Sequence, residues 1–485
     1  MEHNKNSLRK HLSPAHVWAL AFGCIIGWGA FINPGKKFLP NSGVDGTAIA
    51  MLLGALVMIV IAFSYAYMVP KYPKAGGEFT FTKQCFGRIP AYVCGWFLVA
   101  AYLTNVPMNS TAIALIVDGL DGDTDLLKWG FHYQIVGFDV WCGEVLLASS
   151  ILILFGWLNI IGVKKAGFVQ TVLASLLAGS VFILTFAALF SNKTSFANME
   201  PVWGFDRAKA LADSADAASL DLYAHAGRHG IFSAILATFA IAPWAFVGFD
   251  TIPQAAEEFK FSFRKVMKIM IVAILFGCFV YIANNTVAAV AFKQWPEKVL
   301  DGDWVLLLAA EELLGKMGKT LIGIAVSCAV LSGIMGFYLA SSRLMFSMAR
   351  DGYLPKAFAK IDVKHGTPRN AMLFCILISL SGPILGREAL GWFVDMSSIG
   401  ASIGFFFTCA ATLLTMERDG DHKPFLKLSA ILGSCFSVGF VVLKVIPIPN
   451  LSGVHFCPQS YIMLTVWILF GAMFFFLQKN KLTQK

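Results

Sequence analysis

Charged side chains are scarce in this sequence. Only 14% of its 485 residues are Asp, Glu, Lys or Arg, whereas 57% are hydrophobic, and the mean hydropathy is +0.69. An ordinary soluble domain carries about one quarter charged residues. The apolar residues are gathered in runs of about 20, the length that a helix needs to cross roughly 30 Å of hydrocarbon. The sequence therefore excludes a soluble globular protein and predicts a membrane protein.

Motifs for several kinds of chemistry are also missing. The 10 cysteines form no Cys-x-x-Cys pair and lie mostly inside apolar runs, which indicates small buried side chains rather than a metal or disulfide framework. There is no Walker-type phosphate loop, which argues against an ATP-driven pump, and no nucleophile–base pair. His225 and His229 have the i, i+4 spacing of a metal pair, but no third ligand is near them in the sequence. We therefore expect no enzyme, no cofactor and no metal site.

What the sequence contains instead is a series of twelve apolar segments, each expected to form a transmembrane helix. Ser13 followed by Pro14 is typical of a helix N-terminus, and no cleavable signal peptide is recognised before it. The outer stretches Asp118–Gly143 and Ser191–Arg228 are expected to be covering loops with short helices, one of them near 206–218, and another short helix is expected over 303–314. The twelve segments are 14–34, 47–69, 90–117, 144–161, 167–190, 230–257, 266–292, 320–349, 371–385, 389–416, 424–445 and 457–477.

Most of the 38 lysines and arginines fall in segments that would share the side of the N-terminus. The positive-inside rule assigns that side to the cytoplasm, so both chain ends are predicted to be cytoplasmic. Glu257 and Glu258 close the sixth segment on this side and are expected to pair with arginine or lysine. The same placement accounts for the net charge of +9 without nucleic acid as a partner. Membrane lipid is the expected surrounding, and the plasma membrane, as a bacterial inner membrane, is the predicted location.

Two of the twelve segments contain helix-breaking residues near their middles. The first has three glycines within residues 23–29, and the sixth contains Pro243-Trp-Ala-Phe-Val-Gly-Phe-Asp250. Glycine and proline weaken a helix, and in lipid the freed backbone groups need protein, water or substrate as partners. Interrupted helices at corresponding places in two halves indicate a transporter site near the membrane midplane. Because five segments separate the two starts, the pattern fits an inverted repeat of two five-helix units.

Four motifs stand in order along the chain: Gly23-x-x-Ile26-Gly27-x-Gly29-x-Phe31, Tyr72-Pro73-Lys74-Ala75-Gly76-Gly77-Glu78-Phe79, Phe246-Val247-Gly248-Phe249-Asp250 and Met348-Ala349-Arg350-Asp351-Gly352-Tyr353-Leu354-Pro355. Together they resemble the amino acid–polyamine–organocation superfamily of permeases. The resemblance implies the leucine-transporter-type fold, an all-α integral membrane protein of 12 transmembrane helices with two inverted five-helix repeats, helices 1 and 6 unwound, and two C-terminal helices. The implied division is a cytoplasmic tail (1–13), the first repeat (14–190), an extracellular loop (191–229), the second repeat (230–416), and helices 11 and 12 with a cytoplasmic tail (417–485).

The resemblance also implies an amino-acid site between the two breaks. The N–H groups of Gly27, Trp28 and Gly29 would receive the substrate carboxylate, because a helix N-terminus carries partial positive charge. The substrate ammonium would meet the backbone carbonyls of Ile25, Trp244 and Val247. The side chains expected beside the pocket, each with ordinary core packing as the alternative interpretation, are Trp244, Phe246, Phe337 and Asn105.

The sequence leaves the coupling of transport open. The family commonly has serine where Trp28 stands, and some proton-coupled relatives have lysine at the position of Leu177. Asp250 is the coupling candidate, because an ionisable group inside a span is usually functional, with hydrogen bonding of loose backbone ends as the alternative. Ser327 and Ser332 are candidates for a sodium site with carbonyls of the first helix. A proton, a sodium ion and a counter-substrate all remain as alternatives.

The sequence as a whole predicts secondary active transport of an amino acid by alternating access. A polyamine or other organic cation is the alternative substrate; it would favour extra carboxylates in the pocket, where Asp250 is the candidate. A membrane amino-acid sensor is the second alternative, although such sensors tend to carry long cytoplasmic tails and both tails predicted here are short. An integral membrane enzyme would need polar catalytic groups at one depth, and the sequence indicates none.

Overall fold

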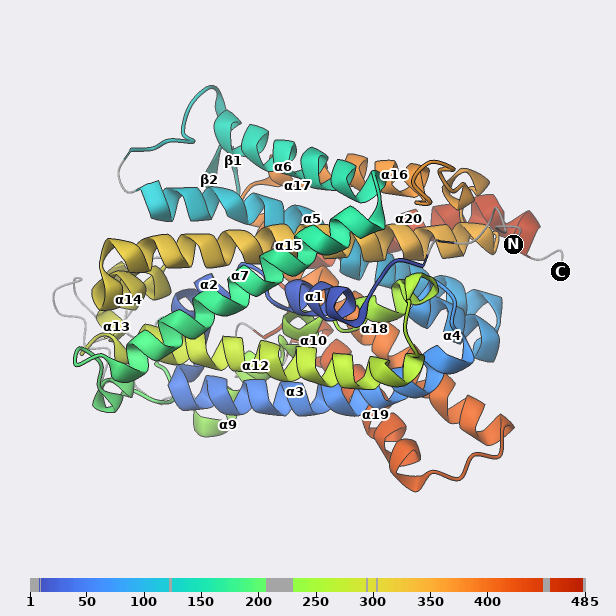
Figure 1. Ribbon diagram of the computed structural model, residues 1–485, viewed down its shortest axis with the longest axis horizontal. Helices are drawn as coiled ribbons and strands as arrows, with labels where there is room; N and C mark the ends of the chain where they lie inside the picture. The colour runs from blue at the N-terminus through green and yellow to red at the C-terminus, as the bar shows by residue number, and fades with distance from the viewer. Residues whose placement is uncertain are drawn as a thin grey trace.

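The computed structural model describes residues 8, 10–121, 124–205, 230–293, 295–301, 304–447 and 454–482. Over these residues the chain is mostly helical, and its long helices run side by side along the long axis of the molecule (Figure 1). Nine helical stretches of the described chain are long and apolar enough to cross a membrane, and three shorter apolar helices accompany them. Large apolar side chains such as Phe168, Phe190 and Leu477 are exposed on the outside, where lipid rather than water suits them. The chain is an all-α, multi-pass membrane protein.

The long helices follow the predicted apolar segments, with most ends within a few residues of the predicted ones. A helix satisfies most of its backbone groups internally, which a lipid surrounding requires. These helices are α3 (Leu39–Lys71), α5 (Arg88–Asp121), α6 (Cys142–Ile160), α7 (Val163–Phe190), α12 (Val266–Val290), α15 (Lys316–Arg350), α18 (Ala389–Arg418), α19 (Pro424–Val445) and α20 (Pro458–Leu482).

Shorter helices occur where a span is interrupted or where the chain leaves the bundle. The predicted start of the first helix is confirmed, because the Ser13 hydroxyl accepts a hydrogen bond from the His16 N–H at 3.3 Å. The helix predicted over 303–314 is confirmed at Val305–Leu314, whereas the one near 206–218 lies outside the described residues. The short helices are α1 (Pro14–Ile25), α2 (Gly29–Asn33), the π-helix η1 (Pro34–Phe38), α4 (Gly77–Phe86), α9 (Gly230–Phe239), α10 (Ala242–Phe246), α11 (Thr251–Gln254), α13 (Trp295–Asp301), α14 (Val305–Leu314), α16 (Arg369–Ser379) and α17 (Ser381–Leu385).

The outer stretch 118–143 differs from the prediction of short helices. α5 continues to Asp121, and the segment before α6 forms a hairpin in which β1 (His132–Ile135) pairs antiparallel with β2 (Phe138–Trp141). Val136 and Gly137 between the strands have φ angles of 51° and 82°. Positive φ angles at two successive residues are typical of a tight type I′ hairpin turn. This turn brings the two strands together, so the loop forms a hairpin.

α2 leads into η1 and α3 without a loop, but the helical conformation is broken at Gly43, whose φ is +66°. The chain folds back at this kink, so that the Thr47 hydroxyl reaches the Phe38 carbonyl at 3.3 Å. The part of α3 after the kink is the second predicted helix, and it begins a few residues before 47. A Cβ atom there would collide with the backbone of Val202 and Gly204, so the bend requires glycine.

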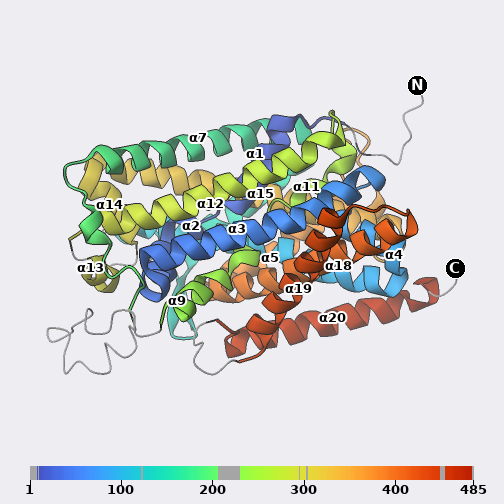
Figure 2. The same cartoon turned by 90° about the horizontal axis from the view of Figure 1, so that it is seen from below.

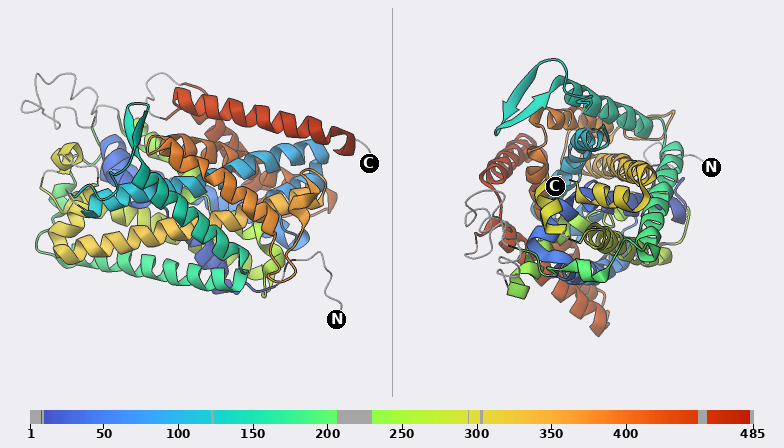
Figure 3. Two further views of the ribbon diagram at one scale, coloured as in Figure 1. Left: turned by 90° about the horizontal axis from the view of Figure 1, so that it is seen from above. Right: turned by 90° about the vertical axis from the view of Figure 1, so that its left-hand side faces the viewer.

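The interrupted segments lie inside the bundle. The long helices around α1, α2 and α10 include α3, α5, α12, α15 and α18, as the views from the side and from the end show (Figures 1 and 3). α4 and the C-terminal end of α20 lie at one end of the long axis, and α13 and α14 lie at the other (Figure 2). α19 and α20 lie on the outside of the bundle (Figure 3). The centre of the molecule is therefore the place where the two interrupted segments meet.

Candidate functional site

The first interrupted segment leaves three backbone donors without a protein partner. α1 ends at Ile25 and α2 begins at Gly29, with non-helical residues between them. No hydrogen bond of the described residues uses the N–H groups of Gly27, Trp28 or Gly29, whereas the next N–H groups bond back to the Gly27 and Trp28 carbonyls. Unpaired N–H groups at the start of a helix form a site that favours an anion.

The second interrupted segment crosses the first at Gly248. After α10 the chain turns through 247–250 before α11 begins. Gly248 has φ +141°, and a Cβ atom on it would lie 2.6 Å from the Ile25 nitrogen and 2.8 Å from the Cys24 Cβ. The close approach of two backbones is possible only because residue 248 has no side chain. The two breaks predicted from separate parts of the sequence are thus in direct contact.

Two tryptophans pack at this crossing. The Trp28 and Trp244 rings are 6.1 Å apart between centroids and tilted by 51°. A Cβ atom on Gly29 would collide with the Trp244 ring, so this glycine keeps space for the indole. Both side chains are at least 94% buried, and the Trp28 Nε1 has no hydrogen-bond partner among the described residues. The wall beside the free N–H groups is therefore aromatic.

The carbonyls predicted to meet an ammonium group retain capacity to accept. The Ile25 carbonyl accepts from the Tyr281 hydroxyl at 3.2 Å, and the Trp244 carbonyl accepts from the Val247 N–H at 3.3 Å. The Val247 carbonyl accepts no hydrogen bond within the described part of the chain. Each carbonyl oxygen has two lone pairs, so all three can accept from a bound cationic group. The contact with Tyr281 was not visible in the sequence.

The other predicted pocket residues contact three different long helices. Phe246 packs on α12 beside Tyr281, with ring centroids 6.2 Å apart. Phe337 of α15 stacks on Tyr102 of α5 at 6.3 Å. Asn105 donates from Nδ2 to the Ser397 hydroxyl of α18 at 2.7 Å, which directs its amide to α18.

Asn109, which the sequence reasoning missed, lies at the break itself. A Cβ atom on Gly27 would be 3.0 Å from the Asn109 Oδ1, and this buried oxygen has no hydrogen-bond partner among the described residues. Its Nδ2 donates to the Asn105 carbonyl at 2.8 Å, which fixes the amide. Asn109 lies one helical turn beyond Asn105 on the same helix face, so the four-residue spacing was the signal that could have identified it.

Asp250 is hydrogen-bonded rather than free. Its Oδ1 accepts the Gly248 N–H at 2.7 Å, and its Oδ2 accepts the Tyr102 hydroxyl at 3.0 Å. The first contact is of the kind that the structural alternative predicts, in which this carboxylate satisfies a loose backbone end. The Tyr102 oxygen is also 3.4 Å from the Glu78 Oε1, so a second buried carboxylate adjoins the break.

An amide occupies the place where a sodium site was considered. The Gln170 Nε2 of α7 donates to the Ser332 hydroxyl at 2.8 Å and to the Ala19 carbonyl of α1 at 3.2 Å. These two oxygens are the kinds of ligand a sodium ion would need from α15 and α1. Ser327 instead lines an open cavity of about 770 Å³ with Lys316.

Two ion pairs, one of them fully buried, lie at the end of the molecule that carries α4. The Arg343 Nε is 2.7 Å from the Glu258 Oε1, with both side chains 1% exposed, and the Arg350 Nη2 is 2.8 Å from the Glu257 Oε1. The backbone of Leu12 bonds to Glu258 and Lys260, which joins the start of the chain to the end of the sixth segment. The prediction that Glu257 and Glu258 pair with basic residues is confirmed.

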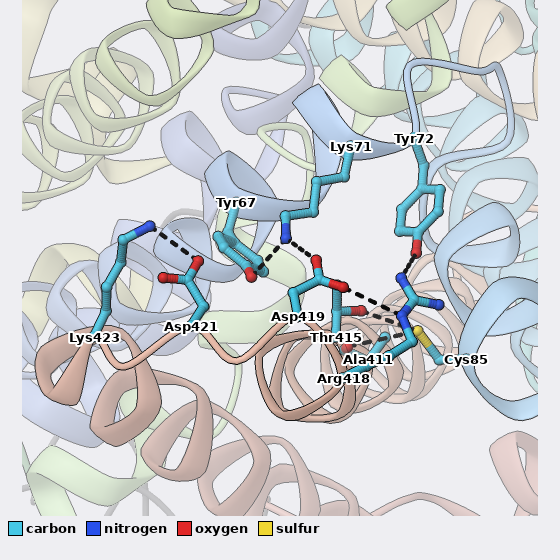
Figure 4. A network of polar contacts seen from close by, with 10 residues as sticks. All are labelled: Tyr67, Lys71, Tyr72, Cys85, Ala411, Thr415, Arg418, Asp419, Asp421 and Lys423. Atoms are coloured by element: carbon cyan, nitrogen blue, oxygen red, sulfur yellow. Dashed lines mark hydrogen bonds and ion pairs between the residues drawn. The ribbon is translucent and has the colours of Figure 1, made fainter.

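A network at the end of α3 fixes neighbouring helix ends (Figure 4). Lys71 donates to the Tyr67 hydroxyl at 2.7 Å and pairs with Asp419, which follows α18. Arg418 donates to the Tyr72 hydroxyl at 2.7 Å. The hydrogen bond from Lys71 lowers the pKa of the Asp419 carboxyl. These polar atoms face solvent, where ion pairs contribute little to stability, so the network positions helix ends and forms no ligand site.

No group of three or more His, Cys, Asp or Glu side chains in the described part of the chain is placed to hold a metal ion. The pair His225 and His229 lies outside that part. Two interrupted helices that meet inside a multi-pass bundle, with unpaired backbone donors at the crossing, are the architecture of a membrane carrier. The amino acid permease family model matches residues 12–477, and the chain belongs to this family.

The chain is also similar to individual amino acid transporters and permeases. The chain is 28% identical to the large neutral amino acids transporter small subunit 2 of Oryctolagus cuniculus, over 77% of this chain and 64% of that protein. It is 25% identical to the cationic amino acid transporter 3, mitochondrial, of Arabidopsis thaliana, over 86% of this chain and 63% of that protein. It is 24% identical to the branched-chain amino acid permease BcaP of Bacillus subtilis (strain 168), over 98% of this chain and 94% of that protein. The chain thus spans somewhat less than two thirds of the first two relatives and nearly all of the third.

Proposed function

We propose that the protein is a secondary transporter that carries an amino acid across the plasma membrane by alternating access. The observation that carries the proposal is the crossing of the two breaks, where unpaired N–H groups of 27–29 lie beside carbonyls with free lone pairs. An amino acid presents a carboxylate and an ammonium on one carbon, and the two sets of backbone groups match these two charges. The family and the relatives' names support the same substrate class.

The side-chain pocket favours neutral substrates. Trp28 and Trp244 lie beside the free N–H groups, and Phe337 stacks on Tyr102, which donates to Asp250 after the second break. Asp250 is the charged group nearest the crossing, and its oxygens already accept from Gly248 and Tyr102. A polyamine would need free carboxylates there, so the arrangement favours a neutral amino acid over an organic cation.

Twelve transmembrane spans in two inverted five-helix repeats, with two further helices, complete the proposal. The nine long spans and the three shorter apolar helices 14–25, 230–239 and 369–385 supply twelve segments. The first repeat would take 14–190, the second 230–416, and both chain ends would be cytoplasmic. In that orientation the Glu258–Arg343 pair closes the cytoplasmic side, and its opening is the step that releases substrate.

Counterflow in proteoliposomes tests the proposal. Purified protein is reconstituted into vesicles loaded with one unlabelled amino acid, and the entry of the same labelled amino acid is followed for leucine, lysine, glutamate and the remaining standard amino acids. We expect counterflow for one or more neutral amino acids and none for putrescine. Absence of counterflow for every amino acid would refute transport, and selective counterflow of putrescine would establish the organic-cation alternative.

A further inference from the structure

Two carboxylates are buried side by side without a cation. Glu78 of α4 and Asp250 are both 0% exposed. All the ion pairs found in the described chain involve other carboxylates. Two neighbouring anions in a buried site strongly disfavour each other, and neither gains from a positive partner here. One proton is therefore expected to be held between them.

Every oxygen of the two carboxylates has a defined partner. The Glu78 Oε1 accepts the Tyr65 hydroxyl at 2.6 Å, and its Oε2 accepts the Gln254 amide at 2.6 Å. The Asp250 oxygens accept the Gly248 N–H and the Tyr102 hydroxyl, as described above. The pair is thus held in one geometry by hydrogen bonds from three helices and from the turn before α11.

The position of the proton follows from the tyrosine between the two acids. A phenol has one proton to donate, and that of Tyr102 is directed to Asp250, at 3.0 Å from Oδ2 and 3.1 Å from the backbone oxygen. The Tyr102 oxygen accepts the Gln254 amide at 3.4 Å and also lies 3.4 Å from the Glu78 Oε1. While the Tyr102 proton is directed to Asp250, a hydrogen bond between Tyr102 and Glu78 needs a proton on Glu78. The arrangement fits a neutral Glu78 and an anionic Asp250 joined through Tyr102.

We infer that Glu78, Tyr102 and Asp250 form a proton relay that couples amino-acid transport to proton movement; this inference rests on the proposed transport function. In the transfer the Glu78 O–H bond breaks as its proton joins the Tyr102 oxygen, while the Tyr102 proton moves to the Asp250 Oδ2. The products are a Glu78 carboxylate, an unchanged tyrosine and a neutral Asp250. One proton has moved and no other bond has changed.

The relay is linked to the substrate site through Gly248. Its N–H stabilises the Asp250 anion, and the same residue packs against the backbone at Ile25, where helix 1 breaks. A movement of helix 1 against helix 6 therefore changes the hydrogen bond that keeps Asp250 ionised. Loss of that bond favours transfer of the proton from Glu78 to Asp250, which links proton position to conformation.

The groups that face the relay are acidic or neutral on every side. The titratable side chains that interact electrostatically with it are Tyr65 of α3, Cys94 of α5 and Cys24 of α1, besides its own members. α18 contributes Gly404, which packs on the Glu78 side chain, and α11 contributes the Gln254 amide. None of these groups replaces a missing cation, so charge balance depends on the proton.

Proteoliposomes with an imposed pH gradient test the relay. With a neutral amino acid that shows counterflow, wild-type vesicles in a more acidic outer solution should accumulate substrate against its gradient. For one proton per substrate, a gradient of one pH unit supports about a tenfold accumulation ratio. Glu78→Gln fixes a neutral amide at the end of the relay, so we expect loss of gradient-driven accumulation with counterflow retained. Tyr102→Phe interrupts the relay and should give the same separation of the two activities.

The matched control is Glu144→Gln, a buried carboxylate that has Arg387 as its partner and lies outside the relay; it should keep gradient-driven accumulation. A pH-sensitive dye trapped in wild-type vesicles reports proton entry on addition of substrate, and keeps the test decisive if a variant does not fold. Wild-type counterflow without any response to the pH gradient would refute the relay and leave the transport function intact. Retention of gradient-driven accumulation by Glu78→Gln would also refute it. Absence of wild-type counterflow itself would refute the transport function and the relay with it.

Discussion

Replacement of Gly29 by alanine should weaken substrate binding through one added methyl group. The new Cβ atom would lie 3.0 Å from the Asn33 Nδ2 and 3.1 Å from the Trp244 Cζ2, and closer still to the neighbouring ring carbon. Ordinary contacts between carbon atoms are about 3.5–4.0 Å, so the indole or the backbone of α2 must shift. Either shift displaces a group that borders the three free N–H donors.

The size of the effect follows from the cost of overpacking a filled site, about 1–3 kcal/mol. We expect binding to need the wild-type positions of these groups, so the cost is paid in the bound state. It then raises Kd by roughly 5-fold to 150-fold, since 1.4 kcal/mol is about tenfold. Equilibrium binding of a labelled substrate to purified protein measures it directly. Thermal unfolding without substrate separates this loss from a general loss of stability.

The matched control is Gly179→Ala on α7, where a Cβ atom would meet nothing within 4 Å. This variant should bind like the wild type. In a Trp244→Leu background the ring is gone, so Gly29→Ala should cost much less than in the wild-type protein; such a coupling is the mark of two residues in contact. An unchanged Kd for Gly29→Ala, or an equal loss in Gly179→Ala, would show that the crossing is not the binding site.

Three further predictions test other parts of the structure. Arg343→Met leaves Glu258 buried without its partner, which typically costs about 3–5 kcal/mol, so the unfolding temperature in detergent should fall. A second substitution, Glu258→Leu, should restore part of the lost stability. An unchanged unfolding temperature in Arg343→Met would contradict the role of the pair. Because the Gln170 amide fills the candidate sodium position, wild-type counterflow should be the same in sodium and in choline, and stimulation by sodium would contradict this assignment. Asn109→Ala removes the unpaired amide oxygen beside Gly27, which we expect to accept a hydrogen bond from the ammonium group of a bound substrate. Loss of a hydrogen bond to a charged group, about 1.5–3 kcal/mol, should raise Kd by roughly 10-fold to 150-fold, and an unchanged Kd would exclude the contact.

The sequence predicted the membrane class, the course of the long helices and the positions of the two breaks. These features depend on local properties, namely continuous apolar runs and clusters of glycine and proline, which act within a few residues of one another. The cap at Ser13 is equally local and was also predicted correctly. The sequence predicted that Glu257 and Glu258 pair with basic residues, but it did not identify Arg350 and Arg343 as the partners.

The remaining features depend on residues that are distant in the chain. Glu78 lies between the second and third predicted segments, and its contact with Tyr102 exists only because α4 folds back against α5 and α11. Gln170 likewise stands in the apolar fifth segment without any local signal, while its amide joins three helices. The hairpin at 132–141 was missed because a turn with positive φ at a valine gives no signal in hydropathy.

The kink at Gly43 has a mechanical consequence. It is held on both sides, since the Asp45 N–H bonds to the Val202 carbonyl at 3.0 Å and the Phe205 N–H bonds to the Pro40 carbonyl at 2.8 Å. α2 is held as well, because the Asn284 Nδ2 of α12 donates to the Ala30 carbonyl at 2.9 Å and the Trp304 Nε1 donates to the Phe31 carbonyl at 3.0 Å. The outer half of the first span is therefore fastened to its neighbours, and a movement of α2 at the crossing must carry these neighbours with it or break their hydrogen bonds.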